Sequence, residues 1–113
     1  MMGKWTQRKI IVDRKPIGPG QALILGLVER EGQFRYWMVN YLKDLGYSKS
    51  ESYGKVAKRL FKSGYLDSDG KLTEKGRRVL EVLRSRGRFE DFVEAVVNGE
   101  GDFQEIWAGL VGV

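Results

Sequence analysis

Two amphipathic helical segments separated by about three residues constrain the fold of this chain more than any other feature. In the first segment, apolar side chains recur with helical spacing at Phe34, Trp37, Met38, Tyr41, Leu42 and Leu45. In the second segment, they recur at Tyr53, Val56, Ala57, Leu60 and Phe61. Gly46 is a typical helix stop, and Ser48 with Glu51 forms a capping-box pattern that starts the next helix. Two helices this close in sequence predict a helix-turn-helix.

The residues before this pair predict a buried helix preceded by an extended arm. The run from Ala22 to Val28 is too apolar for a surface helix, so residues 21–30 are expected to form a helix buried on most sides. Residues 4–15 mix basic side chains with the β-branched run Ile10-Ile11-Val12. This composition predicts a short strand or extended arm, closed by a turn at Pro16–Gly20.

A hairpin and a further helix are expected after the pair. The segments Tyr65-Leu66 and Lys71-Leu72 flank Asp67-Ser-Asp-Gly70, and the Asp-Gly pair is typical of a tight hairpin. Thr73 is a good cap for the next helix, whose apolar positions include Val79 and Leu83.

The passage from the second helix of the pair into this hairpin resembles a known protein family. The motif Tyr53-x-x-Val56-Ala57-x-x-Leu60-x-x-x-Gly64-Tyr65-Leu66, followed by Leu72-Thr73-Glu74-Lys75-Gly76-Arg77, is similar to the recognition-helix-to-wing passage of MarR- and PadR-like transcriptional regulators. The resemblance covers residues 20–87. It implies a winged helix-turn-helix that binds DNA. The wing departs from the family pattern, because its four-residue tip holds two acidic residues and a single nearby base, Lys71.

The predicted fold class is therefore mainly α with a small β-hairpin, a winged helix-turn-helix followed by C-terminal helices. The chain of 113 residues, 42% of them apolar, suits one domain with a modest core. We expect a basic arm or strand in residues 1–19, the winged helix-turn-helix in residues 20–88, and acidic amphipathic helices in residues 89–113.

The net charge of +5 hides a separation of charge along the chain. All 20 lysines and arginines lie in residues 1–88 with nine acidic residues, which gives that part +11. Residues 89–113 hold six acidic residues and no basic one, which gives −6. A basic body favours a polyanion as partner, although a charged surface also serves solubility alone.

The outward face of the second helix is the candidate site for double-stranded DNA. Opposite its apolar stripe lie Lys49, Ser50, Ser52, Lys55, Lys58, Arg59 and Lys62, and Lys71 of the wing is a further DNA-binding candidate. Ser52 and Lys55 fall in the first turns, where side chains read bases, whereas Lys58, Arg59 and Lys62 are placed to meet phosphates. Gly54 would let the backbone approach the duplex closely. The alternative is an ordinary solvated helix face.

Other basic and aromatic residues have two interpretations each. The arm residues Lys4, Arg8, Lys9, Arg14 and Lys15, which surround Trp5, could lie along phosphates or in the minor groove, or be charged ends of a strand. Trp37 and Tyr41 are expected in the core rather than as a base-stacking surface. Tyr36 and Tyr47 fall off the stripe and could donate hydrogen bonds to phosphates or be incidental.

The acidic end of the chain keeps two apolar helical stripes. We expect them to form a homodimer interface or to bind another protein, and the residues concerned are Phe92, Val96, Phe103, Ile106, Trp107 and Leu110. A homodimer would place two recognition helices roughly 34 Å apart, one turn of DNA. Packing of this segment onto its own body is the alternative, and docking of residues 102–107 in the groove of another protein is a third.

Composition argues against most enzyme classes. The chain has no cysteine and no histidine, so thiol and imidazole catalysis, disulfides and Cys/His zinc sites are excluded. It has no phosphate-binding glycine-rich loop, and Glu100, Asp102 and Glu105 are a weak candidate for a cation. We expect no enzymatic activity, no cofactor, no metal and no membrane span, with the protein in the cytoplasm at the nucleoid. The alternatives to a transcriptional regulator are a winged-helix protein–protein adaptor and a sequence-nonspecific nucleoid protein.

Overall fold

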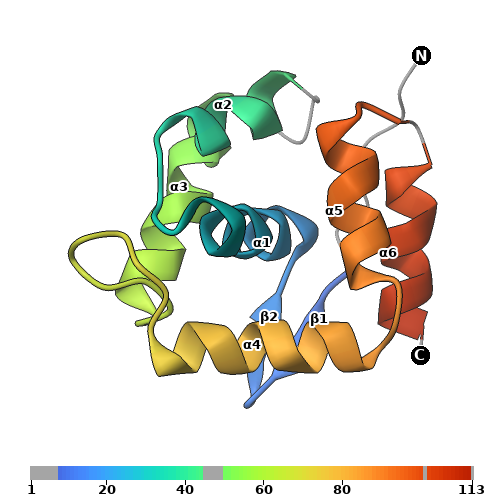
Figure 1. Ribbon diagram of the computed structural model, residues 1–113, viewed down its shortest axis with the longest axis horizontal. Coiled ribbons are helices and arrows are strands. Elements are labelled where there is room, and N and C mark those ends of the chain that lie inside the picture. The colour runs from blue at the N-terminus through green and yellow to red at the C-terminus, as the bar shows by residue number, and fades with distance from the viewer. Residues whose placement is uncertain (1–7, 45–49, 101, 113) are drawn as a thin grey trace.

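The described part of the chain forms six helices and one two-stranded sheet (Figure 1). The computed structural model describes residues 8–44, 50–100 and 102–112, and it leaves out the side chains of residues 43, 44 and 50–53. The elements are β1 (Ile10–Val12), β2 (Lys15–Ile17), α1 (Pro19–Glu31), α2 (Trp37–Asp44), α3 (Ser50–Lys62), α4 (Glu74–Ser85), α5 (Phe89–Val97) and α6 (Phe103–Gly112). This confirms a mainly α fold with a small β-hairpin.

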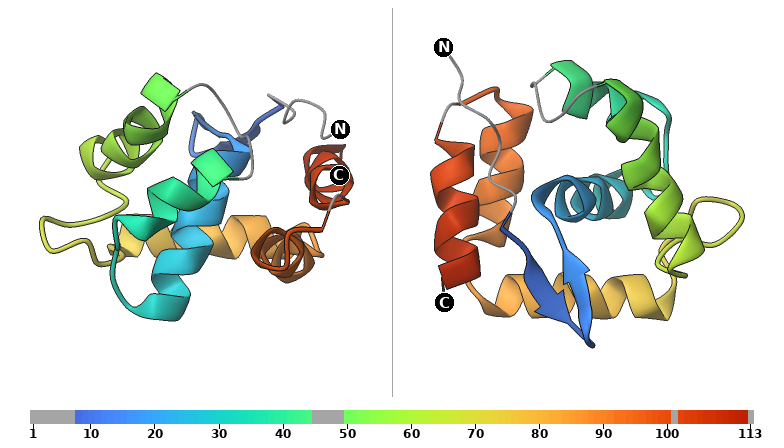
Figure 2. Two further views of the ribbon diagram at one scale, coloured as in Figure 1. Left: turned by 90° about the horizontal axis from the view of Figure 1, so that it is seen from above. Right: turned by 180° about the vertical axis from the view of Figure 1, so that it is seen from behind.

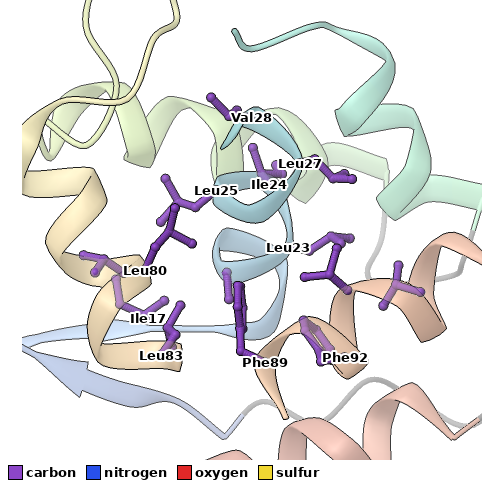
Figure 3. Packing of buried hydrophobic residues seen from close by; sticks show 14 of the residues in the cluster. Ile17, Leu23, Ile24, Leu25, Leu27, Val28, Leu80, Leu83, Phe89 and Phe92 are labelled. Carbon is purple, nitrogen blue, oxygen red and sulfur yellow. The ribbon is translucent and has the colours of Figure 1, made fainter. Parts of the chain in front are cut away.

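Helix α1 is the centre of the molecule, as its composition predicts. Every residue from Ala22 to Val28 is buried, and α1 contacts α2, α3, α4 and α5. In Figure 3 the labelled side chains of α1 point to several sides, Leu25 toward Leu80 of α4 and Leu23 toward α5. Since each neighbour covers one side of α1, the helix presents no polar face to water between Ala22 and Val28, and only its last turn, residues 29–31, is polar and exposed.

The two-stranded sheet lies at the N-terminal end and differs from the prediction. Strands β1 and β2 pair antiparallel with Ile10 opposite Ile17, and the turn between them is at Asp13 and Arg14, both with positive φ. The predicted turn at Pro16–Gly20 was wrong, because Pro16 lies within β2, at an edge where its missing N–H costs no ladder bond.

The predicted hairpin at residues 65–72 is reduced to a looped turn with one isolated bridge, between Leu66 and Leu72. The carboxylate of Asp67 closes the turn by accepting hydrogen bonds from the backbone N–H groups of Asp69 (2.9 Å) and Lys71 (3.0 Å). The backbone N–H of Phe34 donates to the carbonyl oxygen of Gly70 (2.7 Å), so the loop is held against the connection between α1 and α2.

The C-terminal helices pack onto the body of the same chain. The residues expected at a dimer or partner interface, Phe92, Val96, Phe103, Ile106, Trp107 and Leu110, are all buried in its core. The indole N–H of Trp107 donates to the carbonyl oxygen of Arg8 (2.9 Å), and its ring lies 5.2 Å from that of Phe92. The structure therefore favours the alternative for these residues, packing onto the body of the same chain, because α5 packs against α6, α1 and α4.

Ion pairs join α1, α4 and α5 on the outside of this core. Arg84 of α4 binds Glu29 and Glu90, and Arg30 of α1 binds Glu90 and Glu94. Burial raises the pKa of Glu90, but its hydrogen bonds with Arg84 and Arg30 outweigh burial and leave that pKa below the usual carboxyl value. The acidic segment thus neutralises basic residues of its own body. Each of the six helices described is too short or too polar to cross a lipid bilayer.

Candidate nucleic-acid interface

Helix α3 presents its basic side chains to solvent and its apolar side chains to α1 and α2. Val56, Ala57 and Leu60 are buried at 8%, 8% and 0% exposure. On the opposite side Lys55, Lys58, Arg59 and Lys62 are exposed. This arrangement follows from the helical period, since positions three and four apart share a face.

The cations of α3 are free of ion pairs within the described part of the chain. Ion pairs there involve Arg30, Arg78, Arg84 and Arg88, and none of them lies on α3. Arg30 and Arg84, which lie beside α5, are neutralised by ion pairs within the chain. The described cations of α3 form no such pair and keep their positive field for an external anion.

The β1–β2 hairpin adds cations to the same side of the molecule. Lys9, Arg14 and Lys15 are exposed. In the right-hand view of Figure 2, the hairpin and α3 both face the viewer. The sequence indicated a basic arm but gave no sign that the hairpin lies beside the end of α3.

Several predicted site residues are not placed with this surface. Lys71 is exposed, but it lines a hollow with Val28, Glu29, Gly32, Leu72 and Arg77, and no residue of α3 takes part. Lys49, together with the side chains of Ser50 and Ser52, lies outside the described residues, as do the Ser48–Glu51 capping box, Lys4 and Trp5.

An aromatic hollow of about 360 Å³ lies between α2 and α5. It is lined by Trp37, Asn40, Tyr41, Val96, Val97, Asn98 and Gly99. Trp37 is 41% exposed, so the prediction that it belongs to the core was wrong. Its ring lies 5.7 Å from that of Tyr41, which is partly buried and packs against the core. Helix α2 begins at Trp37 rather than at Phe34. Tyr36, just before α2, is 71% exposed.

The described residues contain no group of three or more Asp and Glu side chains placed to hold a metal ion, and Glu100, Asp102 and Glu105 do not form one.

Comparison of the chain with protein-family models, with characterised proteins and with solved structures found no match. The resemblance to MarR- and PadR-like regulators therefore stays a prediction from the sequence motifs.

Proposed function

We propose that this protein binds double-stranded DNA with α3 in the major groove and regulates transcription. The observation that supports the proposal is the set of Lys55, Lys58, Arg59 and Lys62, which are exposed and form no ion pair with any described residue, on a helix whose other side is packed. A rigidly held basic helix matches the width of the major groove and the charge of its phosphates. Glu90 and Glu94 of α5 neutralise Arg30 and Arg84 and leave the cations of α3 available.

Each side chain has a defined role in this proposal. Ser52 and Lys55 read base edges, because they lie in the first turns of α3. Lys58, Arg59 and Lys62 contact phosphates, which gives affinity and salt dependence without sequence information. A homodimer that places two α3 helices on successive turns of DNA stays part of the proposal, with an interface other than the six buried residues of α5 and α6.

Replacing Lys55 and Arg59 together by alanine tests this proposal. We expect weaker DNA binding. The salt slope, which is the change of log affinity with log salt concentration, should be smaller by about one to two, since each phosphate contact gives roughly 0.9. The measurement is a fluorescence-anisotropy titration of a duplex over several salt concentrations. The double variant Arg35→Ala/Arg77→Ala is the matched control, because it also removes two exposed charges that lie outside α3. Equal slopes in the two variants would contradict the assignment of α3 to the groove.

Gly54→Ala separates DNA contact from helix stability. A Cβ at Gly54 meets no atom within 4 Å, so alanine should raise the free energy of unfolding by about 1 kcal/mol. The same methyl group would stand between α3 and a closely approaching duplex, so we expect weaker DNA binding despite the stabler fold. Gly109→Ala in α6 is the control, because its Cβ also meets open space away from α3. DNA affinity unchanged in Gly54→Ala would show that the backbone stays clear of the duplex.

A protein–protein adaptor is the second candidate function, and the exposed rings of Tyr36 and Trp37 favour it. A gel-shift assay with random duplex at low salt distinguishes the two. Retardation is expected for the DNA-binding protein, and its absence at tens of micromolar protein would favour the adaptor. Equal affinity for all sequences would instead indicate a nucleoid protein.

A further inference from the structure

A basic cleft of about 320 Å³ lies between the β1–β2 hairpin and the C-terminal end of α3. It is lined by Lys9, Lys15, Pro16, Gln21, Arg59, Ser63 and Tyr65. Three of these residues are cations, and none is acidic. Lys15 of one wall and Arg59 of the other are 44 positions apart in the sequence, so only the fold brings these charges together.

The position of the cations follows from how the two walls are built. Ile10, Val12 and Ile17 anchor the hairpin in the core, at no more than 3% exposure, so Lys9 and Lys15 are attached to a fixed backbone. Ser63 directly follows α3, and its backbone N–H donates to the carbonyl oxygen of Arg59 (2.8 Å), so both residues lie at the C-terminal end of this helix. No ion pair between described residues involves Lys9, Lys15 or Arg59. Like charges held in one cleft without a counter-charge attract an anion.

The remaining polar groups around the cleft are donors or are already neutralised. Tyr65 is 2% exposed, and burial with the nearby Asp13 carboxylate raises its pKa, so its hydroxyl stays protonated and can donate. Lys75 Nζ lies 5.5 Å from the centre of the Tyr65 ring and donates to the carbonyl oxygen of Ser63 (2.8 Å). Among the described residues, the carboxylate that raises the pKa of Tyr65 is that of Asp13, and it accepts a hydrogen bond from Arg78 Nε (2.8 Å).

We propose that the basic cleft binds a phosphate group, and that in the DNA complex this group is a backbone phosphate beside the groove occupied by α3. Lys9, Lys15 and Arg59 supply positive charge from two sides, and the hydroxyl groups of Ser63 and Tyr65 supply neutral donors. The assignment to DNA rests on the proposed function. The phosphate chemistry of the cleft does not, since a free phosphorylated small molecule has the same group.

The double variant Lys9→Ala/Lys15→Ala tests the cleft against both sources of phosphate. We expect its salt slope for duplex binding to fall by up to about one relative to the unaltered protein, because the cleft holds one phosphate and each neutralised phosphate gives roughly 0.9. The Arg35→Ala/Arg77→Ala control should keep most of the original slope. Both lysines are exposed, so circular dichroism should show an unchanged fold.

A titration of the free protein with inorganic phosphate, followed by the backbone amide signals of Ser63 and Tyr65, forms the second arm. Saturable shifts that vanish in Lys9→Ala/Lys15→Ala, together with an unchanged slope for DNA, would overturn the DNA source and assign the cleft to a free phosphorylated ligand. No shift and no change of slope would overturn the phosphate site itself. A protein that retards no duplex but shows the shifts would refute the proposed function and leave the phosphate site standing.

Discussion

Replacing Trp107 by alanine is expected to lower the free energy of unfolding by about 3–5 kcal/mol, the usual cost of removing a fully buried large aromatic side chain. Trp107 has no exposed surface, packs against Phe92 and donates a hydrogen bond to the Arg8 carbonyl oxygen. It therefore links α6 both to α5 and to the residue before the hairpin. Urea unfolding followed by far-ultraviolet circular dichroism measures the effect.

Two further variants define what the loss means. Trp107→Phe keeps a ring against Phe92 but removes the indole donor, so we expect a smaller loss, near the 1–3 kcal/mol of an unsatisfied buried group. Trp37→Ala is the matched control, because this tryptophan is 41% exposed and should cost much less. Equal losses for Trp107→Ala and Trp37→Ala would contradict the packing of α6 onto the body.

The same variants separate self-packing from dimerisation. A side chain buried inside one chain changes the stability of the monomer at every protein concentration. An interface side chain would instead change a stability that depends on concentration, because association contributes by mass action. We expect the Trp107→Ala loss to be the same at micromolar and at hundredfold higher concentration.

Local patterns in the sequence were sufficient to predict most of the helices. The apolar period predicted α3 and the two C-terminal helices, and Thr73 caps α4 as expected, since its hydroxyl oxygen accepts from the N–H of Gly76 (3.1 Å). These features depend on residues within one or two turns of each other. The burial of α1 could also be predicted from the sequence, because no polar residue interrupts Ala22–Val28.

Features that depend on residues far apart in the sequence could not be predicted from local patterns. The turn at Asp13 and Arg14 has no glycine to mark it, and the nearby Pro16 and Gly18 suggested a later turn. An apolar stripe on α6 shows that it must be covered, but not whether α5 or a second protein covers it. The basic cleft joins Lys15 to Arg59, and only the fold reveals that they meet.

Gly76→Ala is expected to destabilise the protein by roughly 3 kcal/mol, at the upper end of the cost of overpacking. A Cβ at this position would lie 2.3 Å from the carbonyl oxygen of Tyr65 and 3.0 Å from Leu72 Cδ2. The oxygen belongs to the backbone, and it already accepts a hydrogen bond from the N–H of Thr73 (3.1 Å). The loop after α3 and the first turn of α4 cannot separate without losing that bond and the Thr73 cap.

A comparison of the stabilities of Thr73→Ala and Gly109→Ala with that of Gly76→Ala isolates the effect of the close contact between position 76 and the Tyr65 carbonyl group. Thr73→Ala removes the cap and the hydrogen bond that the Thr73 hydroxyl donates to the Gly64 carbonyl oxygen (2.6 Å), and it should cost about 1–2 kcal/mol. Gly109→Ala adds a methyl group to a helix with open space around it and should not destabilise. Thermal or urea unfolding of the three variants gives the order directly, and a Gly76→Ala protein as stable as the Gly109→Ala protein would refute the contact.

This prediction also bears on the meaning of the Leu72-Thr73-x-x-Gly76 pattern. The pattern is explained by packing alone, since Thr73 caps α4 and Gly76 leaves room for the Tyr65 carbonyl group. A capping residue at position 73 and a residue without a side chain at position 76 serve this packing, whatever the chain binds. The pattern therefore bears on the packing of the loop against α4, whereas the proposed DNA binding depends on the cations of α3 and of the basic cleft. A Gly76→Ala protein that stays folded at low temperature should accordingly keep the cations of α3 and of the basic cleft, and we expect its salt slope for duplex binding to stay close to that of the unaltered protein.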